Sequence, residues 1–256
     1  MIRVIVTGAA GRMGREVLSA VTAEPDMHVV AAVDPLHAGE EIGGIVVAHD
    51  LAAAIAETGP NVLVDFTHPS AVEANVATAV AAGVDCVIGT TGLSHETLEA
   101  LAAEAPDGVG LFVAPNFAIG AVLMMRFAVE AARFMPHVEI IELHHDRKAD
   151  APSGTALRTA ALIADARTRV PVTPGRETEI APGARGALVN DVFVHSVRLP
   201  GLVAHQEVLF GGQGQTLSLR HDSIDRTSFM PGVVLAVREI GARSGLIVGL
   251  ETLMGE

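Results

Sequence analysis

The sequence predicts an α/β protein, with a doubly wound, Rossmann-like parallel sheet followed by a second α+β domain that contains a mixed sheet. Three observations support this prediction. Short β-branched runs alternate with alanine-rich stretches of helical length in the first half of the chain, as in a parallel sheet covered on both faces. A glycine-rich segment follows the first of these runs. After Phe117 the alternation ends, and strand patterns separated by turns replace it.

The elements of the first half follow from apolar runs and local start signals. Asp50 and Ser94 are placed to cap helices, and Pro69 suits the first turn of a helix. The strands are apolar throughout, as expected for strands that are buried on both faces. The predicted strands are 2–7, 28–33, 61–66, 84–88 and 109–114, and the predicted helices are 11–23, 51–57, about 69–82 and 96–105.

The second half of the chain has a different succession of predicted elements. We expect helices at 119–134, 153–169 and 229–240, strands at 137–144, 191–199, 206–210 and 215–220, and a long proline- and glycine-rich loop at 171–186. The predicted domains are 1–117, completed by 229–256, for dinucleotide binding, and 118–228 for substrate binding and oligomerisation. Since the second sheet has too few helices to cover both faces, its uncovered face predicts self-association.

Composition and charge argue against several classes of partner. The formal net charge of -13 at pH 7 disfavours a nucleic-acid backbone as a partner. The apolar runs are interrupted well before the roughly 20 residues that a membrane-spanning helix needs, and the start of the chain does not have the pattern of an export signal. Cys86 is the only cysteine; it lies in a strand-like run and suits a reducing compartment as a buried small residue. We therefore expect a cytoplasmic protein with no nucleic-acid or membrane partner.

The glycine-rich segment has the character of a phosphate-binding loop. It lies between the first strand and the first helix, where glycines let a pyrophosphate approach the helix N-terminus. Its spacing, Gly-x-x-Gly-x-x-Gly, is a weak signal alone, but Asp34 ends the second strand, where an acid can bind a ribose hydroxyl. The alternative is a tight turn with a capping aspartate. Pro35 stands where an arginine could hold a 2′-phosphate, which favours NADH. The residues of the predicted loop are Gly8, Ala9, Ala10, Gly11, Arg12 and Met13, followed by Gly14.

Loops after three further strands complete the predicted cofactor site. In doubly wound sheets, ligands bind beyond the carboxyl ends of the strands. Small and hydroxylated residues there suit a close approach to a nicotinamide ring, although each loop alone is equally consistent with ordinary turn chemistry. The loops are 66–69, then Gly89, Thr90 and Thr91, and then Ala114, Pro115, Asn116 and Phe117.

The densest chemistry of the chain lies between residues 142 and 155. It contains His144, His145 and Lys148, which is the only lysine of the protein. Histidine and lysine are natural proton donors when a hydride is added to a carbon. Adjacent side chains of a strand point to opposite faces, so the two histidines cannot easily bind one metal ion, and we expect no metal. For all three side chains to line one pocket, the chain must leave the sheet near His145.

A helix start follows this segment, at Ser153, Gly154 and Thr155. Ser153 is placed to cap the helix. The free amides of the helix N-terminus and the Thr155 hydroxyl can also hold a substrate carboxylate. The two interpretations are compatible if the cap and the ligand share the helix end.

These motifs resemble the 4-hydroxy-tetrahydrodipicolinate (dihydrodipicolinate) reductase family over essentially the whole chain. The resemblance is most specific in Glu142–Thr155 and extends to the glycine loop and the strand-end loops. It implies reduction of a small cyclic dicarboxylate to tetrahydrodipicolinate in lysine and diaminopimelate biosynthesis, with NADH, NADPH or both. It further implies a homotetramer built from the second domain's sheets.

The resemblance also implies residue roles. His144 is the general acid/base, Lys148 donates the proton, and His145, Gly154 and Thr155 bind the substrate. The glycine loop, Asp34 and the strand-end loops hold the nicotinamide cofactor. Ala10 stands where some relatives carry a lysine, which puts the affinity for phosphate in doubt. Two alternatives remain open: an amino-acid or homoserine dehydrogenase with a similar first domain, and a dinucleotide sensor without catalysis.

Overall fold

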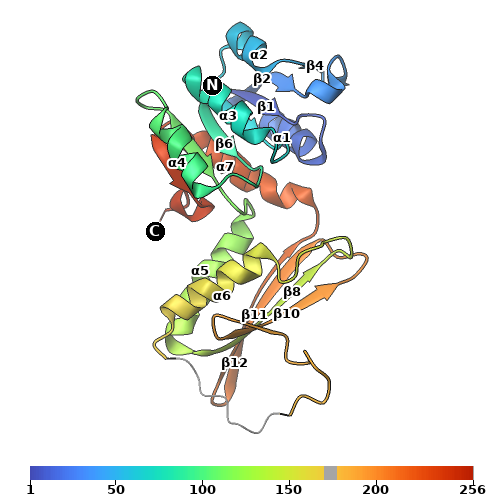
Figure 1. Cartoon of the computed structure of the whole chain (residues 1–256), viewed down its shortest axis with the longest axis vertical. Coiled ribbons are helices and arrows are strands. Elements are labelled where there is room, and N and C mark those ends of the chain that lie inside the picture. Colours follow the sequence, from blue (N-terminus) through green and yellow to red (C-terminus); the bar gives the residue numbers. More distant parts are fainter. Residues whose placement is uncertain (170–177, 256) are drawn as a thin grey trace. The chain divides into compact units, whose positions relative to one another are not determined.

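The computed structural model describes residues 1–169 and 178–255. The chain divides into two compact units (Figure 1), the first made of Met1–Ala118 and Phe229–Glu256 and the second of Ile119–Ser228. Pro171, Pro174 and Gly175 of the predicted loop lie outside the described residues. The described helices include none that is both long and apolar enough to cross a membrane.

The first unit contains an eight-stranded sheet in the order β13-β7-β6-β5-β1-β2-β4-β3. All neighbours pair in parallel except β3 and β4, which form an antiparallel hairpin. The chain runs outward from β1 to one edge and returns through β5 to the other, so the topological switch lies between β1 and β5. The strands are β1 (Ile2–Thr7), β2 (Met27–Val33), β3 (Glu41–Ile42), β4 (Ile45–Ala48), β5 (Val62–Asp65), β6 (Asp85–Ile88), β7 (Gly110–Val113) and β13 (Gly245–Val248).

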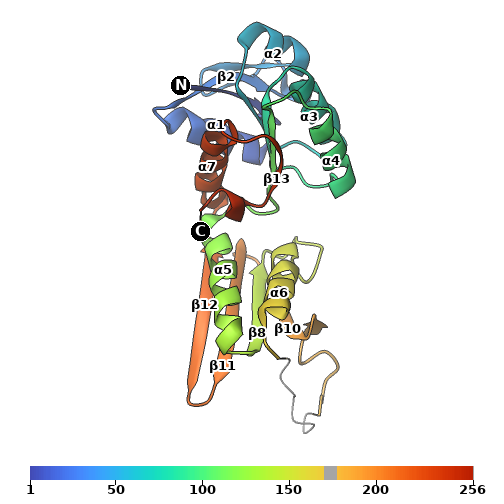
Figure 2. The ribbon, with the colours of Figure 1, turned by 90° about the vertical axis from the view of Figure 1, so that its left-hand side faces the viewer.

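Helices cover both faces of this sheet (Figure 2). α1 and α7 pack together on one face, and α2, α3 and α4 pack on the other. The central strands are consequently buried on both sides: Val4, Ile5 and Leu63 have no exposed surface. The helices are α1 (Arg12–Ala23), α2 (Leu51–Thr58), α3 (Val72–Ala81), α4 (His95–Ala103) and α7 (Met230–Ile240).

The local start signals were correct in two of three cases. The Asp50 carboxylate accepts a hydrogen bond from the Ala53 amide at 2.8 Å, and the Ser94 hydroxyl caps α4. The placement of Pro69 in the first turn of a helix was wrong, because α3 begins only at Val72. The carbonyl of His68 accepts hydrogen bonds from the Ala71 and Val72 amides, so Pro69 lies in a separate turn that precedes the helix.

The second unit contains a five-stranded mixed sheet in the order β12-β11-β8-β10-β9. β8 and β10 pair in parallel, and the other pairs are antiparallel. Two helices, α5 (Ile119–Phe134) and α6 (Gly154–Ala166), pack against each other and against one face of this sheet (Figure 2). The strands are β8 (His137–His144), β9 (Ala187–Val189), β10 (Val192–Arg198), β11 (Ala204–Gly212) and β12 (Gln215–Ser223). The predicted fold class is thus confirmed.

The alternation of β8 places one charged side chain in the core. Val138, Ile140 and Glu142 point towards the helices and are buried, whereas Glu139 and Ile141 point to the other face and are half-buried. Buried carboxylates need partners, since desolvation of an isolated charge is costly. Glu142 has no exposed side-chain surface, so it must be surrounded by cations or hydrogen-bond donors.

Candidate active site

The glycine-rich segment of the first unit forms a tight loop against the start of α1. Gly8 has a φ of +69°, and a Cβ there would lie 2.3 Å from the carbonyl oxygen of Phe66. A Cβ at Gly14 would lie 2.1 Å from the carbonyl oxygen of Gly8. Both positions therefore require glycine. Gly11 is the N-cap of α1, and among the described residues no side chain caps this helix start. The amides of the first turn can therefore bind an anion such as a dinucleotide phosphate.

Asp34 lies beside this loop at the end of β2. Its carboxylate accepts hydrogen bonds from the amides of Ala10, at 3.3 Å, and Leu36, at 3.2 Å, and one of its oxygens lies 3.1 Å from Nδ1 of His37. These are the contacts of a capping aspartate in a tight turn, which is the alternative that the sequence left open for Asp34. It also couples the glycine loop to a histidine that the sequence analysis did not single out. Arg15, likewise unpredicted, donates from Nε to the Ala10 carbonyl at 2.9 Å, whereas Arg12 is exposed.

A fully buried carboxylate, Asp65, ties together the end of β1 and the loops that follow β5 and β6. It accepts hydrogen bonds from the hydroxyls of Thr7 at 2.7 Å, Thr67 at 2.8 Å and Thr90 at 2.6 Å. Asn75 of α3 donates a further hydrogen bond at 2.8 Å. The loop residue Thr90 is therefore an internal anchor, whereas Thr91 is exposed. The sequence pointed to Thr67 and Thr90 as loop residues but not to Thr7, and nothing in their spacing identified the shared acceptor.

Aromatic packing joins the loops after β5 and β7. The rings of Phe66 and Phe117 have centroids 5.7 Å apart, and Phe112 packs edge-on to Phe117 at 5.8 Å. Gly89 lies against the Phe66 ring, where a Cβ would clash at 2.1 Å. The predicted cofactor residues of this unit, from the glycine loop to Phe117, are thus brought to one edge of the sheet, the carboxyl ends of its strands.

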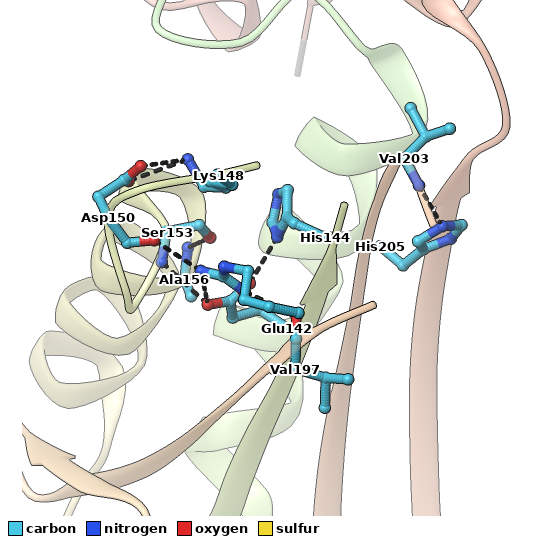
Figure 3. A network of polar contacts seen from close by, with 10 residues as sticks. Glu142, His144, Lys148, Asp150, Ser153, Ala156, Val197, Val203 and His205 are labelled. Carbon is cyan, nitrogen blue, oxygen red and sulfur yellow. Dashed lines mark hydrogen bonds and ion pairs between the residues drawn. The ribbon is translucent and has the colours of Figure 1, made fainter. Parts of the chain in front are cut away.

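In the second unit, His144 lies directly above Glu142 on the helix-covered face (Figure 3). The imidazole Nδ1 lies 2.5 Å from Oε2 of Glu142. Arg198, at the end of β10 and paired in register with His144, donates to both oxygens of Glu142, at 2.8 and 2.7 Å. Burial lowers the pKa of the His144 imidazole below its usual value, although the Glu142 carboxylate acts in the opposite direction. Neither Glu142 nor Arg198 was assigned a role from the sequence.

The chain leaves the sheet immediately after His144, as the predicted pocket required. β8 ends at His144, and a turn follows in which the Lys148 amide donates to the carbonyl of His145 at 3.2 Å. The Lys148 ammonium is turned towards Asp150 (Figure 3) and contacts both of its carboxylate oxygens, at 2.8 and 2.9 Å. Among the described residues, Nδ1 of His145 is buried without a hydrogen-bond partner.

Ser153 links this turn to the start of α6. Its buried hydroxyl caps the helix by accepting from the Ala156 amide at 3.2 Å, and its own amide donates to Oε1 of Glu142 at 3.2 Å. Gly154 is exposed at the helix start, and no atom lies within 4 Å of the position that a Cβ would take. One carboxylate thus holds both the imidazole that was predicted to act as the acid/base and the helix end that was predicted to bind the substrate.

Comparisons with known proteins match this chain from end to end. Residues 2–117 match the family "Dihydrodipicolinate reductase, N-terminus", and residues 120–254 match "Dihydrodipicolinate reductase, C-terminus". The 4-hydroxy-tetrahydrodipicolinate reductases of Moorella thermoacetica and Nocardia farcinica are each 53% identical and cover 99% of this chain and 98% of the relative. A dipicolinate-bound dihydrodipicolinate reductase from Paenisporosarcina sp. TG-14 has a TM-score of 0.89 and 42% identity, covering 99% of this chain and 100% of that one.

Proposed function

This chain belongs to the dihydrodipicolinate reductase family, and from this premise we propose that it reduces 4-hydroxy-tetrahydrodipicolinate to tetrahydrodipicolinate with NAD(P)H, in lysine and diaminopimelate biosynthesis. The observation that carries the proposal is the cluster at the end of β8, where Glu142 binds both the His144 imidazole and the Ser153 amide. Family membership over the whole chain also removes the alternative of an amino-acid or homoserine dehydrogenase.

The cofactor, when bound, supplies the hydride. The residues that would hold it are those of the glycine loop, with Asp34 and the loops after β5, β6 and β7. The requirement for glycine at Gly8 and Gly14, and the α1 start without a capping side chain among the described residues, fit a pyrophosphate group. Asp34 lies beside this loop with 13% of its side chain exposed, and its carboxylate suits a ribose hydroxyl, which favours NADH.

Lys148 is assigned the role of proton donor. The pair that it forms with Asp150 is solvent-accessible on the carboxylate side, where 61% of the Asp150 side chain is exposed. Ion pairs of this kind contribute little to stability, so an anionic substrate can draw the ammonium away at small cost. His144, at the end of β8 just before the turn that contains Lys148, acts as the acid/base. The Glu142 carboxylate beneath it stabilises the protonated imidazole.

The substrate carboxylates are assigned to the start of α6. The Paenisporosarcina relative was solved with dipicolinate, which is a cyclic dicarboxylate, and we propose that a ligand of the same class binds here. The exposed Gly154 leaves the helix N-terminus open to an anion. Thr155 and the buried Nδ1 of His145 are polar groups of the same segment, and both are assigned to substrate binding.

A direct assay tests the proposed function. We expect NADH absorbance to fall when the purified chain meets substrate freshly condensed from pyruvate and aspartate semialdehyde. The matched control contains the enzyme, NADH and each precursor alone, which should leave the absorbance constant. If the chain binds NADH but oxidises none of it in the complete mixture, a non-catalytic dinucleotide sensor is the better interpretation.

The uncovered face of the second sheet supports the predicted homotetramer. Among its half-buried side chains are Ile141 and Leu143 of β8, and Leu188 of β9 is 60% exposed. Apolar side chains on an open sheet face favour association between copies of a chain. We expect sedimentation equilibrium at micromolar concentration to give the mass of four chains, and a mass of one chain would exclude this assembly. The cytoplasmic location stays a prediction.

A further inference from the structure

We propose that Glu142 is a positioning residue, which fixes the His144 imidazole in the tautomer that carries its proton on Nδ1 and anchors the start of α6 at the same time. The inference rests on the proposed function, in which His144 is the acid/base of the reaction. It assigns a role to a buried carboxylate that itself has no exposed surface for contact with a ligand.

The geometry surrounds this carboxylate with donors. Oε2 accepts from Arg198 Nη1 at 2.8 Å and lies 2.5 Å from Nδ1 of His144. Oε1 accepts from Arg198 Nη2 at 2.7 Å and from the amide of Ser153 at 3.2 Å. The three partners come from three places: the end of β8, the end of β10 and the start of α6. Four donor groups therefore converge on two oxygens.

This convergence determines the histidine tautomer. An ionised carboxylate can only accept hydrogen bonds, so the His144 nitrogen that faces it must carry a proton. The Nε2 atom is consequently the one that can gain or lose a proton during the reaction. Burial raises the pKa of Glu142, but hydrogen bonds led by those from the Arg198 guanidinium outweigh burial and leave that pKa below its ordinary value.

The same convergence excludes a neutral amide at this position. In a glutamine, the NH₂ group would face either the Arg198 and His144 donors or the Arg198 and Ser153 donors, whichever way the amide turns. The first arrangement forces Nδ1 of His144 to become an acceptor and moves the ring proton to Nε2. The second leaves the Ser153 amide without its acceptor and loosens the start of α6.

Arg198 connects the same network to the turn after β8 that contains Lys148. Its Nη2 donates to the carbonyl of Asp150 at 2.7 Å, and the Asp150 carboxylate holds Lys148. The buried ion pair thus joins the imidazole, the helix end and the turn that carries the ammonium. Such pairs contribute little to net stability because of their desolvation cost, and a role in geometry accounts for this one better than a role in stability.

The tautomer can be read in the unmodified protein. We expect ¹⁵N-edited NMR of the ring nitrogens, with His144 assigned by comparison with His144→Asn, to show a protonated Nδ1 and an unprotonated Nε2 in the neutral ring. The proposal is overturned if the neutral ring carries its proton on Nε2. This measurement needs neither turnover nor a substitution at position 142, so it stands even if a glutamine there prevents folding.

The variant Glu142→Gln tests the catalytic consequence. We expect kcat to fall by about 10²-fold or more, within the range for loss of acid–base catalysis, with the Kd for NADH within about twofold of the parent protein. The pKa of His144 should fall further below its usual value, because the Glu142 carboxylate favours the charged ring while Lys148 and Arg198 oppose it. A folded variant with unchanged kcat and unchanged ring tautomer would contradict the proposal.

Glu139→Gln is the matched control. Glu139 lies on the same strand and contacts a histidine and an arginine in the same way, with His195 at 2.8 Å and Arg185 as its ion-pair partner, but on the opposite face of the sheet. We expect its kcat and the His144 tautomer to be unchanged. An equal loss of kcat in both variants would mean that any change in the sheet's charge suffices, and the proposal would fall. Absence of reductase activity in the parent chain would instead refute the proposed function and leave the tautomer result intact.

Discussion

The Lys148→Ala variant is expected to lose about 10²- to 10⁴-fold in kcat while its Kd for NADH changes by less than about twofold, because a positioned proton donor contributes roughly that factor. Lys148 is the only lysine of the chain, and it lies in the turn after β8, where its ammonium contacts the Asp150 carboxylate. The measurement is steady-state turnover with freshly condensed substrate, together with an NADH titration of the resting enzyme. Turnover close to that of the parent protein would refute the proton-donor role.

Two companion variants separate the proton from the charge. Lys148→Arg keeps a cation in the turn, but a guanidinium does not release its proton near neutral pH, so we expect a loss of kcat close to that of the alanine variant. Arg147→Ala removes an exposed cation from the same turn and is expected to leave kcat within about twofold of the parent value. If Lys148→Arg retained full turnover, Lys148 would act through its charge alone.

The Gly14→Ala variant is expected to weaken NADH binding by at least about tenfold and to destabilise the folded protein by about 1–3 kcal/mol, the usual cost of overpacking. The added Cβ would lie 2.1 Å from the Gly8 carbonyl oxygen and 2.8 Å from Cα of Ala9. The loop has no room to retreat, because Gly8 itself lies against the backbone of Phe66. The phosphate-binding loop must therefore change shape or the start of α1 must unwind.

Fluorescence titration with NADH and thermal unfolding measure the two effects. Gly211→Ala is a suitable control, since no heavy atom lies within 4 Å of the added Cβ and Gly211 is not among the positive-φ glycines. We expect that control to bind NADH as the parent protein does. An unchanged Kd for NADH in Gly14→Ala would show that this loop does not contact the cofactor.

Prediction of the fold from sequence succeeded where the local signal was strong. Apolar runs predicted five of the eight strands of the first sheet, β1, β2, β5, β6 and β7, and Asp50 and Ser94 marked helix starts. The long helix α5 and the strand β8 have the predicted bounds, 119–134 and 137–144. The strands β3, β4, β9 and β13 were not predicted. β3 and β9 have only two and three residues, too few for an apolar pattern to stand out, whereas β4 and β13 have four residues, as many as β5, β6 and β7, which were predicted.

In the candidate site, too, some residues could be predicted from the sequence and others could not. Histidine, lysine and the helix cap within one short segment pointed to proton chemistry, because neighbours in sequence must be neighbours in space. Glu142 lay in that segment, and strand parity places it on the same face as His144. For Arg198, neither a position in this segment nor strand parity indicated a contact with Glu142. It lies 56 residues from Glu142 along the chain and reaches it only because β10 pairs with β8.

The sequence by itself determined the type of fold, the glycine loop and the groups that can exchange protons, since these depend on local patterns of residue type. Only the tertiary structure decided which polar groups meet: Asp65 with Thr7 at the end of β1 and Thr90 after β6, and Glu142 with His144, Arg198 and the start of α6. The physical reason is that a buried carboxylate must find its donors wherever the sheet brings strands together. Strand order and register, which arise from the packing of the whole unit, determine those partners.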